Sequence, residues 1–277
     1  MESKTVANKY RLIEPIGSGA FGYIYKALNI RNGQQVALKM EPLAAETKML
    51  KNETKIYQYL NGQEGIPKVL WFGVDDKNYY MAIDLLGSSL QKIRENSKPF
   101  SLELAISLSR VIVKRLECVH QKGLIHRDVK PDNFLFGQDE KSNVLHLIDF
   151  GFCKKYLLDD GITHIPLREN RNLLGTPNFV SVNVHDGCEP SRRDDLESVA
   201  YIFLYLTREN LEWESYSIHL DYKNMNNKIR AEKMRVMMDD QTPKIIKKYF
   251  EYCRGLKFDE APDYNYIFDL FKKLKCF

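Results

Sequence analysis

The chain has 277 residues, of which 44% are hydrophobic and 28% are charged, and its formal net charge is +4. This length and hydrophobic content support one sizeable domain or two lobes that share a cleft. The charge excess is small and the basic residues are scattered, which argues against a dedicated nucleic-acid binder. The longest apolar run, residues 199–206, is too short for a membrane span, and the N-terminus has no signal-peptide pattern.

Residues 10–40 predict three strands, with a turn at residues 31–35. Residues 46–60 have helical spacing, which would bring one apolar set to a single face: Met49, Ile56, Tyr57 and Leu60. Two more strands are predicted at residues 68–74 and 79–86. The N-terminal part is therefore expected to be an antiparallel β-rich lobe with one main helix.

Beyond Gly87 the pattern becomes helical. Ser101 is a plausible N-cap for a long helix over residues 102–120, whose predicted apolar stripe comprises Leu104, Leu108, Val111, Ile112 and Leu116. The runs FLF (134–136) and HLIDF (146–150) suggest a hairpin. Residues 195–207 are apolar nearly all round, which predicts a buried helix.

The last third is expected to be helical, with loops at residues 239–243 and 258–264. The predicted fold class is therefore α+β and bilobal. Residues 1–87 form the N-terminal lobe in this interpretation, and residues 88–277 form the C-terminal lobe. A cleft between two lobes is the natural place for a ligand.

The five cysteines are odd in number and widely spaced, and no pair has metal-ligand spacing. Reduced thiols in the cytosol or nucleus are the preferred interpretation of this set: Cys118, Cys153, Cys188, Cys253 and Cys276.

The segment GSGAFG places glycines at 17, 19 and 22, which matches G-x-G-x-x-G. A dinucleotide fingerprint needs a helix after the last glycine, whereas β-like YIY follows here, so we expect the loop to join two strands. Such a loop can lie over nucleotide phosphates, because glycines let backbone N–H groups approach closely.

Lys39 ends the VALK strand, and Glu53 lies on the helix that follows. A lone lysine at a strand end is usually surface decoration. An ion pair with Glu53 would instead hold Lys39 toward the α- and β-phosphates of a nucleotide.

The segment HRDVKPDN, residues 126–133, is the strongest signal. Asp128 can accept a proton from a substrate hydroxyl, Lys130 can neutralise charge on a phosphoryl group, and Asn133 can ligate Mg²⁺. The alternative without a function is an ordinary polar turn between a helix and a hairpin, but such a turn does not explain these residue types at these spacings.

The tripeptide DFG, residues 149–151, follows in the required order. Asp149 would chelate Mg²⁺ bridging the β- and γ-phosphates, and Phe150 would pack under the helix that carries Glu53. The strand aromatics Tyr23, Tyr25, Tyr79 and Tyr80 are better explained by sheet packing than by base stacking, so no direct nucleic-acid contact is expected.

Together these residues resemble the eukaryotic protein kinases over essentially the whole chain. The nearer resemblance is to the casein kinase I family of Ser/Thr kinases, with the vaccinia-related kinases as cousins that fit less well. The stretches that carry it are IHRDVKPDNFLFG, IDFGFCKKY, REN at 168–170, SVN (181–183) in place of Ala-Pro-Glu, SRRDDLES (191–198) and FDEAPDYNYIFDLF (258–271).

The resemblance implies a catalytic set of Lys39, Glu53, Asp128, Lys130, Asn133 and Asp149. It implies that Thr176 hydrogen-bonds Asp128 and favours Ser/Thr substrates. It also implies that Asp195 anchors the backbone of the His126–Arg127 turn.

For the cofactors, ATP and Mg²⁺, the resemblance implies a glycine-rich loop over the phosphates: Gly17, Ser18, Gly19, Ala20, Phe21 and Gly22. Adenine would lie among aliphatic side chains, namely Ile16, Ile24, Ala37, Leu86, Leu135 and Ile148. Asp84 and Leu86 would present backbone groups to its edge, and Ile83 fits the gatekeeper position.

Three features depart from the family pattern. Asn178 stands where relatives carry an arginine that holds an acidic or phosphorylated substrate group, so the remaining candidates for that anion site are Arg127, Arg168 and Arg171. Residues 220–230 lack the usual basic cluster. Because the sequence stops at Phe277, the family's C-terminal regulatory tail is expected to be absent.

The expected function is that of an active, monomeric Ser/Thr protein kinase in the cytoplasm or nucleus. Its expected protein substrates carry acidic or phosphorylated sites, in signalling, trafficking or DNA repair. Two alternatives stay open: a pseudokinase scaffold that binds partner proteins, and a small-molecule phosphotransferase on a kinase-like fold. Activity without phosphorylation of the activation loop is also expected, because its candidate sites are few: Thr163, Thr176 and Ser181.

Overall fold

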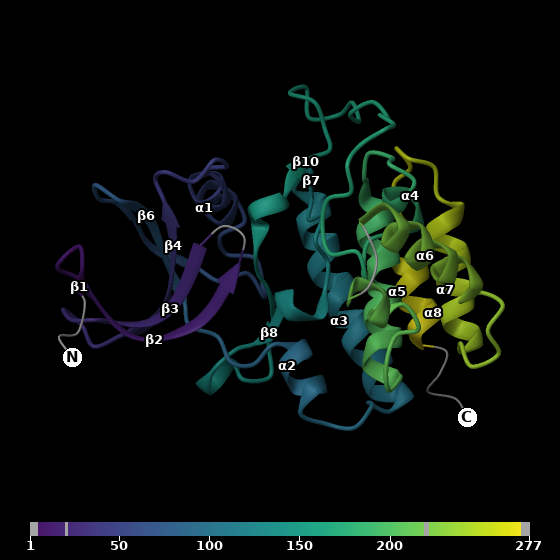
Figure 1. The fold of residues 1–277 in the computed structure, drawn as a ribbon, viewed down its shortest axis with the longest axis horizontal. Helices are drawn as coiled ribbons and strands as arrows, with labels where there is room; N and C mark the ends of the chain where they lie inside the picture. Colours follow the sequence, from purple (N-terminus) through teal and green to yellow (C-terminus); the bar gives the residue numbers. More distant parts are fainter. Residues whose placement is uncertain (1–4, 20–21, 219–221, 273–277) are drawn as a thin grey trace. The chain divides into compact units, whose positions relative to one another are not determined.

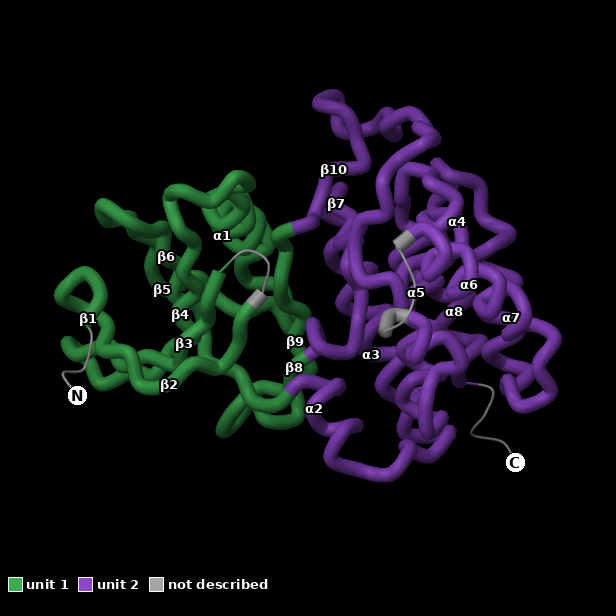
Figure 2. The backbone as a smooth tube through the Cα atoms, in the orientation of Figure 1, with its two compact units in different colours: residues 1–88, 135–151 green, residues 89–134, 152–277 purple. Residues whose placement is uncertain are grey.

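The computed structural model describes residues 5–19, 22–218 and 222–272 (Figure 1). The chain divides into two compact units (Figure 2). The first comprises Met1–Ser88 and Leu135–Gly151, and the second comprises Ser89–Phe134 and Phe152–Phe277. The segment 135–151 thus returns to the N-terminal unit, and the predicted lobe bounds at residues 87 and 88 stay a prediction.

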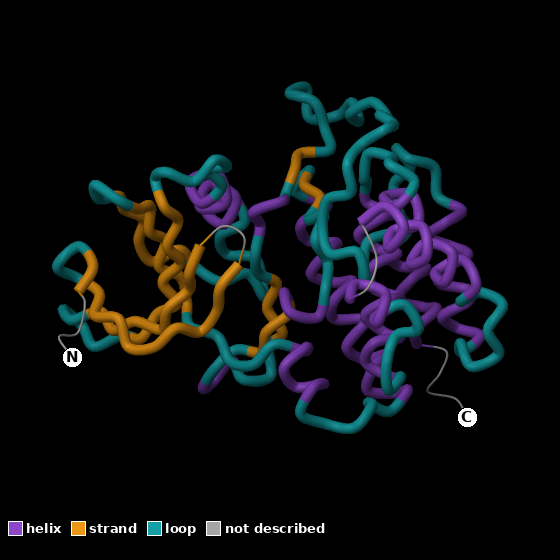
Figure 3. Tube along the Cα trace, in the orientation of Figure 1, coloured by secondary structure: helices purple, strands orange, loops and turns teal. Residues whose placement is uncertain are grey.

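The first unit is built on an antiparallel six-stranded sheet in the order β1-β2-β3-β4-β6-β5 (Figure 3). Its strands are β1 (Thr5–Val6), β2 (Tyr10–Gly19), β3 (Gly22–Asn29), β4 (Gln35–Pro42), β5 (Val69–Val74) and β6 (Asn78–Asp84). The five strands predicted from alternation are confirmed, while the two-residue β1 gave no pattern long enough to detect. Pro15 lies in β2 where the pairing with β3 shifts register, the kind of irregular position that tolerates a strand proline.

The core of this unit is formed by side chains from the strands of the sheet. Val36, Leu38, Ala27 and Ala82 are fully buried, and Tyr10 packs against Trp71 with ring centroids 5.4 Å apart. Of the four strand tyrosines, Tyr80 is buried, Tyr25 packs against the core and Tyr79 stacks on Phe72, whereas Tyr23 is 57% exposed. Sheet packing therefore explains three of the four.

Helix α1 (Leu50–Tyr59) begins four residues later than the spacing predicted. Its N-cap residue, Met49, offers no capping side chain. Glu41 on β4 takes that role: its carboxylate accepts the N–H groups of Met49 (2.7 Å) and Leu50 (3.0 Å). The predicted hairpin is confirmed as β8 (Phe134–Phe136) paired with β9 (Leu145–Leu147), with η2 (Asp139–Lys141) between them.

The second unit is mainly helical. Its helices are α2 (Leu90–Glu95), α3 (Leu102–Gln121), α4 (Val182–His185), α5 (Arg192–Thr207), α6 (Tyr222–Arg235), α7 (Lys244–Gly255) and α8 (Tyr264–Lys272). The short strands β7 (Leu124–Ile125) and β10 (Lys154–Lys155) pair with each other. Short 3₁₀ helices occur at η1 (Pro131–Asn133) and η4 (Glu214–Ile218), and a further one, η3 (Phe150–Phe152), spans the point where the chain passes from the first unit to the second.

Helices α3 and α5 form the centre of this unit and pack against each other. Ser101 caps α3 as predicted, since its hydroxyl accepts the N–H of Leu104 at 3.3 Å. The predicted stripe was wrong at Leu104, which is 47% exposed. The buried face centres on Ala105, Ile112 and Leu116, and a one-residue step of about 100° turns Leu104 to its edge.

Helix α5 is buried along most of its length, which confirms the prediction for residues 195–207. At its start the Asp194 carboxylate accepts the N–H of the N-cap residue Ser191 at 2.7 Å. Of the cysteines, Cys118, Cys153, Cys188 and Cys253 are free thiols, while Cys276 lies outside the described residues. Within the described ranges, no helix combines the length and apolar character needed to cross a membrane.

Candidate active site

The first unit brings together the lysine, glutamate and aspartate that the sequence singled out. Lys39 Nζ lies 2.8 Å from Glu53 Oε2 and 3.1 Å from Asp149 Oδ1, so the predicted ion pair is present. Burial alone would lower the pKa of Lys39, but the two carboxylates outweigh it and raise that pKa above its usual range. Burial also raises the pKa of Glu53, and the Lys39 ammonium opposes that rise. Lys39 is therefore a fixed cation between two acidic side chains.

Asp149 is held in a left-handed backbone conformation, with φ of 65°. Its N–H donates to the Tyr57 hydroxyl oxygen at 3.0 Å. The next residue, Phe150, is fully buried and meets the Tyr57 ring edge-on at 4.9 Å. Because Tyr57 and Glu53 share α1, the expected packing of Phe150 against that helix is confirmed, and one helix positions both acidic groups around Lys39.

The glycine-rich segment forms the β2–β3 hairpin, as expected for a loop that joins two strands. Gly17 pairs with Ile24, Ser18 with Tyr23 and Gly19 with Gly22. Gly22 has φ of 139°, and a Cβ there would lie 1.8 Å from the Met40 carbonyl oxygen, so no side chain fits. The predicted contacts of Ala20 and Phe21 lie outside the described residues.

The predicted adenine-contacting residues all belong to the first unit. Ala37 and Ile83 are sheet partners on β4 and β6, and each is 9% exposed. Ile16 is 47% exposed, and the others are partly exposed: Ile24, Leu86, Leu135 and Ile148. The unit thus presents several incompletely buried aliphatic side chains, while their contact with adenine stays a prediction.

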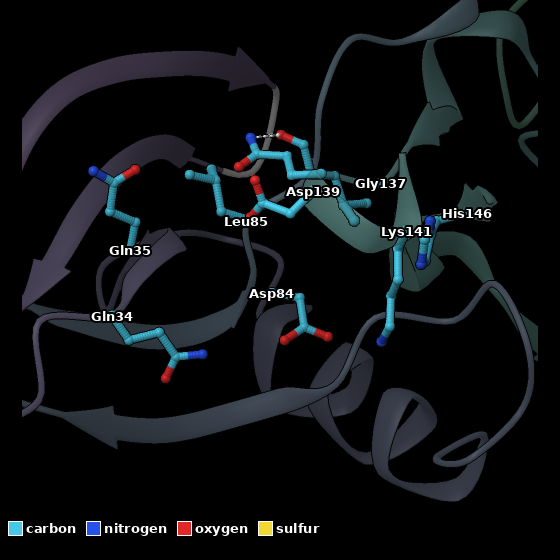
Figure 4. Close-up of a pocket in the computed structure, with 10 residues that line it drawn as sticks. Gln34, Gln35, Asp84, Leu85, Gly137, Asp139, Lys141 and His146 are labelled. Carbon is cyan, nitrogen blue, oxygen red and sulfur yellow. Dashed lines mark hydrogen bonds between the residues drawn. The ribbon is translucent and has the colours of Figure 1, made fainter. Parts of the chain in front are cut away.

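A pocket of about 410 Å³ lies in the first unit beside the strand that ends at Asp84 (Figure 4). Amide, carboxylate, ammonium and imidazole groups dominate its lining: Gln34, Gln35, Asp84, Leu85, Leu86, Gly137, Gln138, Asp139, Lys141 and His146. Gln138 Nε2 donates to the Leu86 carbonyl at 2.9 Å, the dashed line in Figure 4. That carbonyl is already engaged, which the sequence did not indicate.

In the second unit, Asp128 is the centre of a dense hydrogen-bond set. Its carboxylate accepts the Thr176 N–H at 3.0 Å and the Thr176 hydroxyl at 2.8 Å, and Lys130 Nζ lies 2.8 Å from its other oxygen. Asn133 Nδ2 donates to the Asp128 carbonyl oxygen at 2.8 Å. The predicted Thr176–Asp128 bond is therefore present, and the 4% exposed aspartate is oriented from three sides.

The turn that carries Asp128 is anchored as expected by Asp195 on α5. Its carboxylate accepts the N–H groups of His126 (2.7 Å) and Arg127 (2.9 Å), which stabilises φ of 70° at Arg127. His120 adds a contact that the sequence did not reveal, with Nε2 2.9 Å from Asp195. Burial would raise the pKa of Asp195, but these hydrogen bonds outweigh it, and the pKa lies below its ordinary value.

The predicted anion site contains an acid that sequence reasoning missed. Glu189, 2% exposed, lies 2.7 Å from Lys154 Nζ and 3.7 Å from Arg171 Nε. Arg127 Nε donates to the Phe152 carbonyl at 2.6 Å, and burial lowers the pKa of Arg127 while Glu189 opposes that shift. Arg168 has an exposed side chain, and its carbonyl accepts the Glu189 N–H. The basic groups are thus partly neutralised.

The segment SVN is anchored to the start of α5. Ser181 is fully buried, its hydroxyl donates to Asp194 at 2.6 Å, and it caps α4 by accepting the N–H of Val184. Asn183 Nδ2 donates to the same carboxylate at 3.1 Å. Two hydrogen bonds to Asp194 therefore hold this segment, which stands where the general kinase pattern has Ala-Pro-Glu.

The family model of the protein kinase domain matches residues 10–259. The chain belongs to the protein kinase family. Membership makes the kinase a phosphotransferase with an α+β kinase fold, and it implies ATP as phosphoryl donor and proteins as acceptors. The finer kinship with casein kinase I is a proposal.

The residues expected to hold Mg²⁺ in the kinase have suitable donor chemistry. Asn133 commits its amide nitrogen to Asp128, which leaves the amide oxygen as the group to offer a cation. Asp149 has a carboxylate that is 29% exposed. Both supply the hard oxygen ligands that Mg²⁺ prefers.

Proposed function

We propose that this kinase transfers the γ-phosphoryl group of ATP to Ser or Thr hydroxyls of acidic proteins, in the manner of casein kinase I. The observation that carries the proposal is the double hydrogen bond from Thr176 to Asp128. A threonine that touches the proton-accepting carboxylate occupies the space beside it, which favours a short aliphatic hydroxyl over a phenol.

Each catalytic side chain has one role in this reaction. Asp128 accepts the proton of the attacking hydroxyl, whose oxygen forms the new P–O bond as the bond to ADP breaks. Lys130, 2.8 Å from Asp128, is placed to neutralise charge on the transferring group. Lys39, fixed by Glu53, would bind the α- and β-phosphates.

Asn133 and Asp149 would hold Mg²⁺, which supplies positive charge to the phosphate oxygens when it is bound. At the adenine edge, Gln138 already satisfies the Leu86 carbonyl, so recognition at Leu86 would use its N–H.

Preference for acidic substrates is supported by the net charge of +4 and by the basic groups near Glu189: Arg127, Lys154 and Arg171. The casein kinase I assignment is supported by the motif stretches, above all SVN and its anchor on Asp194. Location in the cytoplasm or nucleus is part of the same proposal.

The test is a phosphorylation assay with ATP, Mg²⁺ and acidic peptides that differ only in Ser, Thr or Tyr at the acceptor position. We expect the Ser and Thr peptides to be phosphorylated and the Tyr peptide not, with Asp149→Asn as the inactive control. If wild type and Asp149→Asn both phosphorylate the peptides no faster than background, the protein is instead a scaffold without kinase activity. Strong competition by small alcohols would indicate a small-molecule phosphotransferase.

A further inference from the structure

One face of α6 carries three polar side chains that all contact the segment 177–186. Asn226 Oδ1 lies 3.2 Å from His185 Nδ1, and Arg230 forms a bidentate ion pair with Asp186. Lys233 donates to the Val180 carbonyl oxygen. Positions 226, 230 and 233 are spaced by four and three residues, which places them on one side of the helix. The described parts of α4 and α6 lie side by side (Figure 1).

Lys233 is fully buried, and its ammonium meets three acceptors. It donates to the carbonyls of Pro177 (2.7 Å) and Val180 (2.6 Å), and its Nζ lies 3.1 Å from His185 Nε2. The Tyr201 ring centroid is 4.4 Å away, a cation–π distance. A buried ammonium is costly unless its donors are satisfied, and here all three are matched.

His185 contributes to this cage as a neutral ring. Burial, then the Lys233 ammonium, lowers the pKa of His185 to about 3. The neutral imidazole can therefore accept from Lys233 at Nε2 while Nδ1 carries its proton toward Asn226. Burial also lowers the pKa of Lys233, and the nearby Glu197 carboxylate opposes that shift.

The carbonyls that Lys233 binds flank the residues that follow Thr176. Trp213 Nε1 donates to the Asn178 carbonyl between them, at 3.1 Å. The Thr176 hydroxyl donates to the Asp128 carboxylate. Residues 177–180 follow Thr176 directly, so their backbone conformation is tied to the position of Asp128. By binding the Pro177 and Val180 carbonyls, Lys233 therefore also fixes the orientation of the backbone of residues 177–180.

We propose that Lys233 is a positioning residue for substrate docking: it holds residues 177–180 in the form that lays an acceptor peptide beside Asp128. The inference rests on the proposed function, because it concerns the peptide-docking side of that reaction. Arg230 and Asn226 support the same arrangement from the outer part of the α6 face.

The test compares Lys233→Met, which keeps length and removes the charge, with Lys223→Met, the same change at an exposed lysine of α6. Casein and an acidic Ser peptide serve as substrates. Nucleotide affinity is measured separately with ADP. We expect Lys233→Met to raise the peptide KM about tenfold or more, with the ADP Kd within about twofold of wild type. Lys223→Met should match wild type in both.

Because loss of a buried, fully hydrogen-bonded ammonium can prevent folding, Arg230→Ala provides a second variant, at a side chain that is 39% exposed. We expect it to raise peptide KM two- to fourfold with ADP affinity and melting temperature near wild type. An unchanged peptide KM in Arg230→Ala, or in folded Lys233→Met, would overturn the proposal. So would a parallel loss of ADP binding and peptide affinity, which indicates a folding role. Failure of wild type to phosphorylate any peptide would refute the proposed function instead.

Discussion

Glu41 fixes the position of Glu53 through the backbone of α1. The Glu41 carboxylate accepts the N–H groups of the N-cap residue Met49 and of Leu50, the first residue of α1, and Glu53 lies in the first turn of that helix. Glu41 is fully buried and belongs to β4, the strand that also carries Lys39. Both ends of the Lys39–Glu53 ion pair therefore depend on the same strand.

The first prediction concerns this cap. Glu41→Gln removes the charge and one acceptor, and charge-assisted bonds of this kind contribute about 1.5–3 kcal/mol. We expect faster amide exchange at Met49 and Leu50 and a loss of about tenfold in kcat/KM for ATP. Glu46→Gln, at an exposed glutamate just before α1, is the control. Unchanged exchange and activity in Glu41→Gln would show that α1 holds its place without the cap.

The second prediction concerns the two catalytic charges. Lys39→Met and Asp128→Asn should each lower phosphoryl transfer by several orders of magnitude while leaving the fold intact, because they remove groups that position and stabilise the transition state. Lys26→Met and Asp76→Asn make the same changes at positions outside the site. Steady-state kinetics and a melting curve are the measurements. Retention of more than about a tenth of the rate contradicts the assignment, since tenfold is only about 1.4 kcal/mol.

The third prediction is that the kinase is active without phosphorylation of its activation loop. Ser181 is fully buried against Asp194, and the Thr176 hydroxyl donates to Asp128, so both have structural roles. Thr163 is exposed and its hydroxyl donates to Asp160. Phosphatase-treated enzyme and Thr163→Ala should keep at least half of the wild-type activity. A collapse after dephosphorylation that an upstream kinase reverses would rule this out.

The fourth prediction concerns pH. The pKa of His185 is lowered to about 3 in the folded chain, against about 6.5 unfolded, so between these values the unfolded chain binds more protons. Stability from this site is complete above about pH 6.5 and is lost as pH falls toward 3. Relative to His185→Gln, wild type should lose about 1–2 kcal/mol of unfolding free energy between pH 7.5 and 5. The groups that act on His185 are Lys233, Arg230 and Asn226. If the unfolding free energies of wild type and His185→Gln change with pH in parallel, the proton responsible binds to a group other than His185.

Much of the fold and site could be predicted because the signals are local. Alternation marked the strands of the first unit, and short fixed spacings marked Asp128, Asn133 and Asp149. The ion pair between Lys39 and Glu53 followed from one strand and the next helix.

The residues that sequence reasoning missed act between distant segments. Glu41, Glu189 and Lys233 are charged residues of types that are usually exposed, and only the folded chain reveals that each is buried against its partner. Leu104 shows the opposite error, because it was predicted to be buried and is exposed. The spacing of apolar residues indicates which side of a helix is buried, but not where the middle of that buried side lies.

Glu189 bears on how far a priming phosphate helps substrate binding. Its carboxylate already lies beside Lys154 and Arg171, which reduces the positive charge that an incoming phosphate meets. Asn178 adds no charge, and its carbonyl is held by Trp213. An arginine would offer two parallel charge-assisted bonds to phosphate, whereas an amide offers one weaker contact.

The last prediction is that this kinase favours acidic Ser/Thr peptides but gains less from a priming phosphate than its relatives do. Matched peptides with phosphoserine or serine three residues before the acceptor are compared in wild type, Asn178→Arg and Asn178→Gln. The arginine should raise the ratio of their kcat/KM values about tenfold, which corresponds to about 1–2 kcal/mol in a partly exposed site. The Gln variant should stay near wild type, and added salt should erase the gain. If wild type already shows strong priming and the arginine adds nothing, Glu189 does not weaken the site, and other residues bind the phosphate.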